Sequence, residues 1–498
     1  MLARRLLPTA PPRRELLLAA GAASVSAVIA LAGVHKLGTE GLVAPVAVVA
    51  AAILLARPLA AITLVVVLVI VCETTFGIFT FTAKVYEIVF KDISLVDVLV
   101  AIAVASVALD LIRTGRRLYV PRPLVLPLVT LALAMVTGVV VGHAAGASLR
   151  FAVASEDVLA YLLLLPLAVC NLDLDRRQVM WLLGGALALA VVKAVLGLVE
   201  VAAHLGPSIE GVAELTYYEP TANWVIMIAL LSVFAAVLAR AKPPLWMLLG
   251  SPLLLACLLL SYRRSFWIAA VLGGLLVLVL GTSAHGRRLL VPVGLGLGVA
   301  IWLLGSVHFQ GAAPLVKRAT SLSPARIEAS AEDRYRLNER ADVIAAIEAH
   351  PIAGLGVTVP WKATTETLAI EGGESSQGRQ YVHFALLWFW MKLGVLGALA
   401  YVGFQLATMW IAWRAWRRSR EPLLRAFALA SLCGVVGLIA MDTTASFTGV
   451  EARFTVVYAV QVGLLALLAR PAGWRAPPPP QPSPPELTLV APMAPALR

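Results

Sequence analysis

Apolar runs of roughly 15 to 25 residues recur along this chain, separated by short joints that carry charged residues, proline or glycine. A helix needs about 20 apolar residues to cross a hydrocarbon core about 30 Å thick. Backbone groups left unpaired in lipid cost several kcal/mol each, and the runs lack the alternation of barrel strands. The composition agrees, because 60% of the residues are hydrophobic and only 14% are charged. The sequence therefore predicts an all-α, polytopic integral membrane protein.

The spacing of the runs predicts about 12 to 14 transmembrane helices. The second and third runs are short and are divided only by Arg57 and Pro58, so they are expected to form either two spans or one broken or re-entrant element. The candidate spans are residues 15–33, 42–56, 58–72, 94–112, 123–142, 157–171, 177–203, 221–240, 245–261, 265–281, 288–305, 382–408, 424–442 and 453–469.

The lysines and arginines in the joints predict how the chain is oriented in the membrane. With the N-terminus in the cytoplasm, 23 of them fall in cytoplasmic joints and tails, and seven fall in the short outer joints. Cytoplasmic loops carry an excess of Lys and Arg, so both termini are expected in the cytoplasm. The doublet Arg263 and Arg264 then lies on the outer face, against this preference.

These assignments divide the chain into four regions. Residues 1–305 are expected to form a membrane domain with the first eleven spans, and residues 306–381 one large extracytoplasmic loop. Residues 382–470 carry the last three spans, and residues 471–498 form a Pro-rich tail that cannot build a core and is expected to be disordered in the cytoplasm.

The net charge of +12 does not indicate a nucleic-acid-binding protein. The positive residues lie in short joints, and no soluble basic domain exists to hold a duplex. The cysteines show neither a disulfide framework nor a metal-binding spacing, so they are expected to be packing residues. They are Cys72, Cys170, Cys257 and Cys433.

The large outer loop contains one predicted helix. Ser330 followed by Asp333 resembles a capping box, and the helix is expected to run to about Ala349, before His350 and Pro351. Its spacing places four residues on one face, so two arginines continue an apolar stripe. These residues are Arg336, Arg340, Val343 and Ile347.

Several arginines are expected at headgroup depth on the outer face. They are Arg150, Arg263, Arg264, Arg336 and Arg340. A planar guanidinium forms forked, charge-assisted hydrogen bonds with phosphate, so the set suits a phosphate or pyrophosphate ligand. The alternative is that the arginines bind lipid headgroups or pair locally with Glu and Asp.

Two further ionisable residues are candidates. His383 begins the twelfth span, and a histidine can act as a general base near neutral pH, although it can also be an interfacial hydrogen-bonding residue. Lys193 lies inside a span and is therefore a functional candidate, with Glu200 as a possible helix partner. No metal site and no cofactor are predicted, because the histidines are scattered and phosphate-loop and nucleophile-elbow motifs are absent.

Three stretches resemble the O-antigen ligase and polymerase family of bacterial envelope glycosyltransferases. "LLLSYRRSFWIAA" has Arg264 at the family's arginine position. "RADVIAAIEAHPIAGLGV" is similar to the family's helix that opens with an arginine, here Arg340, and ends in His-Pro and a Gly-x-Gly turn. "VHFALLWFWMKLGVLGAL" resembles the family's span that opens with a histidine, here His383.

Weaker similarities and two departures accompany these stretches. "YYEPTANWVIMIAL" is similar to a Pro-x-x-Asn motif that opens a span at Asn223, and "LRFAVASEDVLAYLL" contains Arg150. The chain has Phe384 where the family commonly has asparagine, and Val343 where it has an aromatic residue.

The resemblance implies a GT-C-like membrane enzyme in the cytoplasmic membrane of a bacterium. Its donor would be a glycan linked through pyrophosphate to undecaprenyl, and its acceptor a glycan or lipid at the outer face. Arg264 and Arg340 would bind the pyrophosphate, and His383 would act as general base in a metal-independent, inverting transfer.

Ligases and polymerases of this family share these motifs, so both activities remain open. A transporter or flippase of lipid-linked sugars is a second class of function. Such proteins commonly contain duplicated or inverted halves, and the sequence shows no such internal repeat. The extracytoplasmic glycan transferase is therefore the favoured hypothesis.

Overall fold

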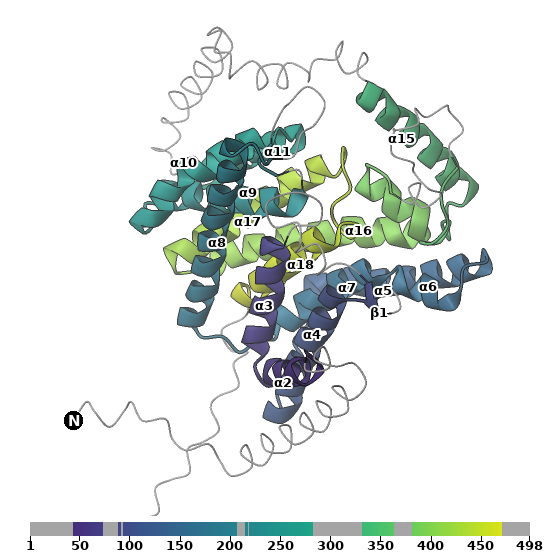
Figure 1. The fold of residues 1–498 in the computed structure, drawn as a ribbon, viewed down its shortest axis with the longest axis horizontal. Coiled ribbons are helices and arrows are strands. Elements are labelled where there is room, and N and C mark those ends of the chain that lie inside the picture. Colours follow the sequence, from purple (N-terminus) through teal and green to yellow (C-terminus); the bar gives the residue numbers. More distant parts are fainter. Residues whose placement is uncertain are drawn as a thin grey trace, which may run out of the picture.

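The computed structural model describes residues 43–72, 88–90, 93–206, 215–217, 219–281, 331–362 and 381–470. Most of them are helical (Figure 1). The helices are α2 (Val43–Ala56), α3 (Pro58–Val71), α4 (Leu95–Thr114), α5 (Arg122–Ala144), α6 (Leu149–Ala154), α7 (Asp157–Cys170), α8 (Arg176–Ala202), α9 (Pro220–Leu238), α10 (Leu245–Leu260), α11 (Arg264–Gly281), α15 (Ala331–Ala349), α16 (Ala385–Arg418), α17 (Pro422–Met441) and α18 (Ala452–Leu468). The strands β1 (Ile88–Phe90) and β2 (Ile93–Ser94) form a small antiparallel pair.

Helices α9, α16, α17 and α18 form the centre of the bundle. Helices α17 and α18 each pack against both α9 and α16, and α9 and α17 bury residues on all sides. Helices α4, α5, α8 and α11 surround them and bury one stripe each. A helix that is apolar all round is stable either in a core or in lipid, so the exposed apolar faces of the outer helices are suited to lipid. The protein is a multi-pass, all-α membrane protein.

Seven of the described helices are long and apolar enough to cross a membrane, and three shorter apolar helices, α7, α10 and α18, accompany them. Helices α2 and α3 meet at a bend of 118° between Ala56 and Pro58. Each has 14 residues, or about 21 Å at 1.5 Å per residue, which is short for a 30 Å core. Of the two alternatives expected there, the bend favours one broken or re-entrant element over two separate spans.

Some predicted regions lie outside the described residues. They are the spans at 15–33 and 288–305, the tail at 471–498 and, within the large loop, residues 306–330 and 363–380. The predicted loop helix is confirmed as α15, and its end at Ala349 agrees with the sequence. Helix α16 was expected to end near residue 408, but it continues to Arg418. Trp413 and Trp416 form an edge-on pair there, with ring centroids 5.0 Å apart.

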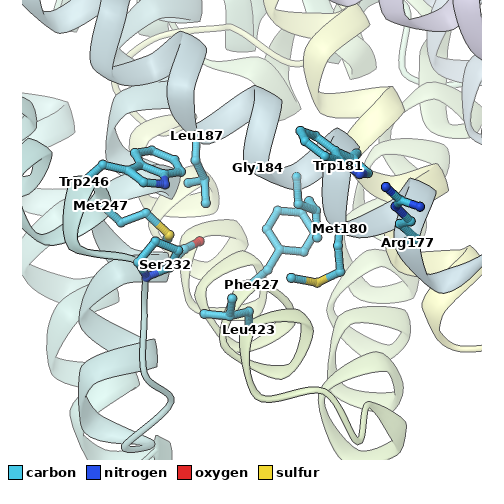
Figure 2. A pocket seen from close by; sticks show the side chains of 12 residues that line it. Arg177, Met180, Trp181, Gly184, Leu187, Ser232, Trp246, Met247, Leu423 and Phe427 are labelled. Carbon is cyan, nitrogen blue, oxygen red and sulfur yellow. The ribbon is translucent and has the colours of Figure 1, made fainter.

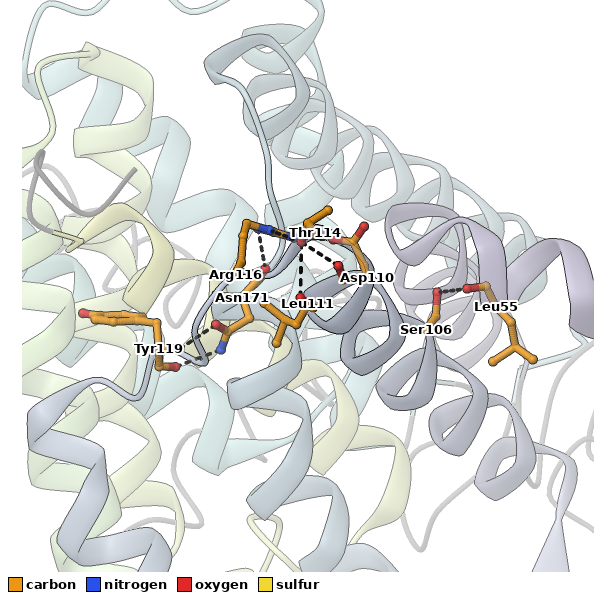
Figure 3. Close-up of polar contacts among 8 residues, drawn as sticks. All are labelled: Leu55, Ser106, Asp110, Leu111, Thr114, Arg116, Tyr119 and Asn171. Atoms are coloured by element: carbon orange, nitrogen blue, oxygen red, sulfur yellow. Dashed lines mark hydrogen bonds and ion pairs between the residues drawn. The ribbon is translucent and has the colours of Figure 1, made fainter. Parts of the chain in front are cut away.

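One end of the bundle, here called the basic face, carries the joints 115–121, 171–175, 239–244 and 419–421, and all of these joints except 171–175 contain arginine. Figure 3 shows how two of these joints are connected. The side chain of Asn171 accepts a hydrogen bond from the amide of Tyr119 at 2.8 Å and donates one to its carbonyl oxygen at 2.8 Å. Arg116 donates to the Asn171 carbonyl oxygen and forms an ion pair with Asp110. The opposite end, here called the site face, carries the joints 261–263 and 442–451 and the segments 350–362 and 381–384.

Candidate active site

Two helices bring His383 and Glu339 together on the site face. His383 directly precedes α16, and Glu339 lies on the face of α15 that packs on it. The Nδ1 atom of His383 lies 2.9 Å from Oε2 of Glu339, and the backbone amide of His383 donates to the same oxygen at 3.0 Å. The Glu339 side chain is 1% exposed and that of His383 is 25% exposed. The carboxylate is therefore buried behind an imidazole that solvent or a substrate can reach.

This contact determines which nitrogen of His383 can accept a proton. A carboxylate oxygen accepts hydrogen bonds, so Nδ1 carries the hydrogen and Nε2 has the free lone pair. The rings of Tyr335 and Tyr381 stand edge-on to the imidazole, at centroid distances of 6.1 and 5.0 Å. The imidazole is thus held in one orientation with Nε2 available as a base, as in catalytic His-carboxylate pairs.

Tyr381 connects this pair to the arginines. Its hydroxyl donates to the carbonyl oxygen of Ser446 at 3.3 Å. Burial raises the pKa of Tyr381 to about 12, while the charges of Arg263 and Arg336 oppose this rise and that of Glu339 adds to it. Side chains from the joint before α11 and from α15 therefore act on this phenol in the segment before α16. The structure brings predicted residues His383, Arg263 and Arg336 to one site.

Aromatic rings support two of the arginines. The guanidinium carbon of Arg263 lies 5.9 Å from the ring centroid of Phe447, and that of Arg340 lies 5.7 Å from the ring centroid of Phe384. A cation–π contact attracts the charge without using N–H donors, so it does not compete with an anionic ligand for them. Phe384, where the sequence departs from the family, thus forms part of the site.

The joint between α10 and α11 has a strained backbone that directs Arg263 and Arg264. Tyr262 has a φ of 51°, a left-handed conformation that bulky residues rarely adopt. The amide of Thr216 donates to the carbonyl oxygen of Leu260 at 3.1 Å, and the indole of Trp267 donates to that of Leu258 at 3.0 Å. Contacts on both sides thus hold the strained turn, and Arg264 begins α11 directly after it, half-buried.

The turn that follows α15 packs against a break in α16. Gly394 has a φ of 68° inside the helix, and this break leaves the carbonyl groups of Met391 and Lys392 without their helical partners. The amide of Leu355 donates to the Met391 oxygen at 2.7 Å, and that of Gly356 donates to the Lys392 oxygen at 3.0 Å. The turn after α15 therefore completes the hydrogen bonding of α16, which fixes Glu339 relative to His383.

Glycine is required where the two backbones meet. Gly354 and Gly356 have φ values of 71° and 85°. A Cβ atom on Gly354 would lie 2.5 Å from the amide nitrogen of Gly394, and one on Gly356 would lie 2.6 Å from that of Gly142 in α5. The Gly-x-Gly turn quoted from the sequence is thus a docking element between α5 and α16.

A buried ion pair lies behind the site. Arg453 and Glu219 are in contact, and the Arg453 side chain is fully buried. Its Nε donates to the carbonyl oxygen of Val69 at 3.0 Å. The carboxylate of Asp442 accepts hydrogen bonds from the hydroxyl groups of Tyr401 at 2.7 Å and Thr448 at 3.1 Å.

Three of the predicted site residues lie on other elements. Arg150 is exposed on α6, which packs against α5. Lys193 is buried in α8, where its Nζ lies 4.5 Å from the ring centroid of Tyr217 and 3.4 Å from the carbonyl oxygen of Val71. Asn223 is buried in α9 and donates to the carbonyl oxygens of Tyr217 and Glu219, both at 3.1 Å. This Asn therefore fixes the segment that carries Glu219.

The loop helix presents a different face from the predicted one. Val343 and Ile347 are buried as expected, but the stripe continues through Glu339 and Asp342, while Arg340 is exposed. Glu339 was not selected from the sequence, although it lies three residues after Arg336 and four before Val343, on the same helical face. Among the described residues, no three His, Cys, Asp or Glu side chains meet in a way that could hold a metal ion.

The comparisons with known proteins give one family. Residues 249–402 match the family model described as O-antigen ligase. The matched segment contains α10, α11, α15 and the first half of α16, and with them the Arg263–Arg264 doublet, Glu339 and His383. The resemblance stated from the sequence is therefore confirmed over this segment. No curated protein matches the chain.

Proposed function

We propose that this protein transfers a lipid-linked saccharide to an acceptor. Residues 249–402 match the O-antigen ligase family, and this match supports a ligase-like or polymerase-like role in polysaccharide biosynthesis. The donor is an undecaprenyl-pyrophosphate-linked glycan, and the reaction occurs at the outer face of a bacterial cytoplasmic membrane. The contact of 2.9 Å between His383 and Glu339 carries the proposal, because it presents an oriented base beside a group of arginines.

In the proposed reaction, His383 activates the acceptor. An acceptor hydroxyl donates its hydrogen bond to Nε2, its oxygen attacks the anomeric carbon of the donor, and its proton passes to Nε2. The bond between the anomeric carbon and the pyrophosphate oxygen breaks, and its electron pair leaves with the pyrophosphate. Attack from the side opposite the leaving group inverts the anomeric centre. Glu339 stabilises the imidazolium that forms, because its buried carboxylate already contacts Nδ1.

In the proposed reaction, the arginines stabilise the negative charge of the leaving group. Negative charge grows on the pyrophosphate as the sugar bond breaks, so cations fixed before the reaction lower its barrier without reorganising. Arg263, Arg264, Arg336 and Arg340 are the candidates, and the supports described for Arg263 and Arg340 favour such preorganisation. Pyrophosphate is a good leaving group, so positioning and cationic stabilisation are sufficient in a metal-independent transfer.

The test compares His383→Ala and Arg264→Ala with the wild type in bacterial membranes that contain the lipid-linked donor. We expect unconsumed donor to accumulate on the outer leaflet, with transfer rates lowered by about 10²-fold to 10⁴-fold for His383→Ala. His143→Ala is the matched control, because this histidine is exposed on α5 and its Nδ1 lies 2.9 Å from the carbonyl oxygen of nearby Ala147.

The distribution and size of the glycans distinguish the alternatives. Addition of one preformed unit identifies a ligase, and a ladder of products identifies a polymerase. Donor retained on the inner leaflet would instead identify a transporter or flippase. Unchanged transfer in both variants, at normal protein levels, would contradict the proposed site.

A further inference from the structure

A hollow opens into the bundle on the basic face, at the end of the molecule away from His383 (Figure 2). Its volume is about 280 Å³, and its lining is almost entirely apolar. Helices α8, α9, α10 and α17 supply the walls. The lining residues are Arg177, Met180, Trp181, Leu183, Gly184, Leu187, Ser232, Pro244, Trp246, Met247, Leu423 and Phe427.

The hollow has the depth of one membrane leaflet. Arg177 stands at its mouth in the first turn of α8, and Leu187 lies ten residues further along the same face. At 1.5 Å per residue this is about 15 Å, or half of a hydrocarbon core about 30 Å thick. A smaller hollow continues inward and shares Leu183, Leu187 and Phe427 with the first. An acyl chain entering from the basic face therefore meets two adjacent apolar hollows.

The mouth has the features of a headgroup site. Arg177 is exposed there, and Lys242 is exposed two residues before the lining residue Pro244. Trp181 and Trp246 flank the opening and are 70% and 42% exposed. Tryptophan is enriched at membrane interfaces, and basic residues attract anionic lipids.

The interior offers no competing polar ligand site. The Ser232 hydroxyl donates to the carbonyl oxygen of Ile228 within its own helix at 2.7 Å. In the deeper hollow, the indole of Trp224 donates to Gln461 at 2.9 Å, and Gln461 donates to Ser431 at 2.9 Å. These polar groups are satisfied by the protein, so the surface left to a ligand is apolar.

We propose that this groove is a binding site for one anionic phospholipid of the leaflet at the basic face, with an acyl chain along α8 and the phosphate at Arg177. The charge at the mouth favours an anionic headgroup over a zwitterionic one. The leaflet depth of the main hollow favours a phospholipid over a lipid entering from the site face. Bound lipid fills the space between α8 and α17 and stabilises the folded protein, since a ligand that binds only the native state raises its stability.

Two neighbouring glycines allow a matched test. Gly184 lines the groove and Gly185 is exposed beside it on α8, and a Cβ atom at either position would meet nothing within 4 Å. Gly184→Leu therefore adds a side chain to the groove from a position where the Cβ atom has space, and Gly185→Leu makes the same change outside the groove. Both gain the same helix propensity relative to glycine, so this effect cancels in the comparison.

The measurement is native mass spectrometry of the purified full-length protein in neutral detergent, with dioleoylphosphatidylglycerol or dioleoylphosphatidylcholine added, together with thermal unfolding. We expect the wild type and Gly185→Leu to bind phosphatidylglycerol at least tenfold more tightly than phosphatidylcholine and to gain stability from it. Gly184→Leu should lose at least tenfold in affinity. Arg177→Gln should bind the two lipids equally, and this variant tests the site even if Gly184→Leu folds poorly.

Three results would overturn the proposal. The first is that Gly184→Leu and Gly185→Leu bind phosphatidylglycerol with equal affinity, and the second is that the wild type does not prefer the anionic lipid. The third is that undecaprenyl phosphate displaces bound phosphatidylglycerol at a lower concentration than added phosphatidylglycerol does. The last result would assign the groove to a polyprenyl chain instead.

Discussion

The two faces of the bundle differ in how far their acidic residues are buried. Within the described part of the chain, every buried Asp or Glu lies on or near the site face; these residues are Glu156, Glu200, Glu219, Glu339, Asp342 and Asp442. On the basic face, Asp173 and Asp175 are exposed, and Asp110 and Glu421 are partly exposed. Asp and Glu side chains are thus in contact with solvent on the basic face and are removed from solvent on the site face.

The ion pairs show the same difference. Arg176 and Glu421 join α8 to α17 on the basic face, with side chains that are 75% and 19% exposed. Arg453 and Glu219 join α18 to the segment before α9, with side chains that are 0% and 10% exposed. Exposed pairs contribute little, but removing one partner of a buried pair leaves an uncompensated charge. The site face is therefore where charge changes should have large effects.

The largest effect is expected from Arg453→Leu. It leaves the Glu219 carboxylate buried without its partner, which should cost about 3 to 5 kcal/mol of folding free energy and lower the amount of folded protein. Thermal unfolding in detergent and the yield of monodisperse protein measure this effect. The double variant Arg453→Met with Glu219→Met removes both charges and should recover much of the loss. A double variant as unstable as the single one would show that the Arg453 hydrogen bond to Val69, rather than the charge pair, stabilises this region.

A change at Glu339 should reduce activity more than stability. Glu339→Gln retains the shape but removes the charge beside Nδ1 of His383, so transfer should fall by about 10²-fold or more and the pH at half-maximal rate should shift. Glu348→Gln, at an exposed position on the same helix, is the matched control. If Glu339→Gln and the control transfer saccharide at equal rates, Glu339 has only a structural role.

These two predictions also mark what could be learned from the sequence. Apolar runs and joint arginines predicted the helices and the basic face, because hydrophobic length and loop charge are local properties of the chain. The pairing of Glu339 with His383 could not be predicted in the same way. The residues are 44 positions apart, and the contact depends on the docking of the turn after α15 into the break at Gly394.

The arginines illustrate the same limit. Their types and their positions near the ends of predicted spans indicated an anion site, and Arg263 and Arg336 indeed lie near Tyr381. Arg150 has the same signature in the sequence but lies on α6. Charge and membrane depth are therefore readable from the chain, whereas convergence on one site depends on packing between distant helices.

A third prediction concerns Glu156, which precedes α7 on the site face. Both of its carboxylate oxygens are buried and have no hydrogen-bond partner among the described residues. Burial raises the pKa of Glu156 to about 8, with a smaller contribution from the charge of Asp157. The folded protein thus holds this proton more tightly than the unfolded chain, whose pKa is near 4.5. Stability should therefore fall as pH rises from about 4.5 to 8.

Glu156→Gln should remove this pH dependence. The amide and the protonated carboxyl are similar in size and neither is charged, so the variant and the wild type should be about equally stable at pH 5. At pH 9 the variant should be more stable by several kcal/mol, because only the wild type must ionise a buried carboxyl group and each unit of pKa difference between folded and unfolded states corresponds to about 1.4 kcal/mol. The difference in unfolding temperature between the wild type and the variant, measured as a function of pH, reports on Glu156 alone because the other buried acids are the same in both proteins. A difference that does not change with pH would contradict a buried, protonated Glu156.

The smallest effect is expected from Arg176→Gln on the basic face. Its guanidinium contacts Glu421 but is 75% exposed, so water solvates both groups when the pair is lost, and the change should be below about 0.5 kcal/mol and smaller still at high salt. Glu421 also precedes α17, where it can remain favourable to the helix N-terminus without Arg176. Thermal unfolding at low and high ionic strength tests this, with Arg453→Leu measured in parallel. Similar losses of stability in Arg176→Gln and Arg453→Leu would show that burial does not determine how much an ion pair contributes. The arginines of the basic face would then stabilise the fold as well as determine its orientation in the membrane.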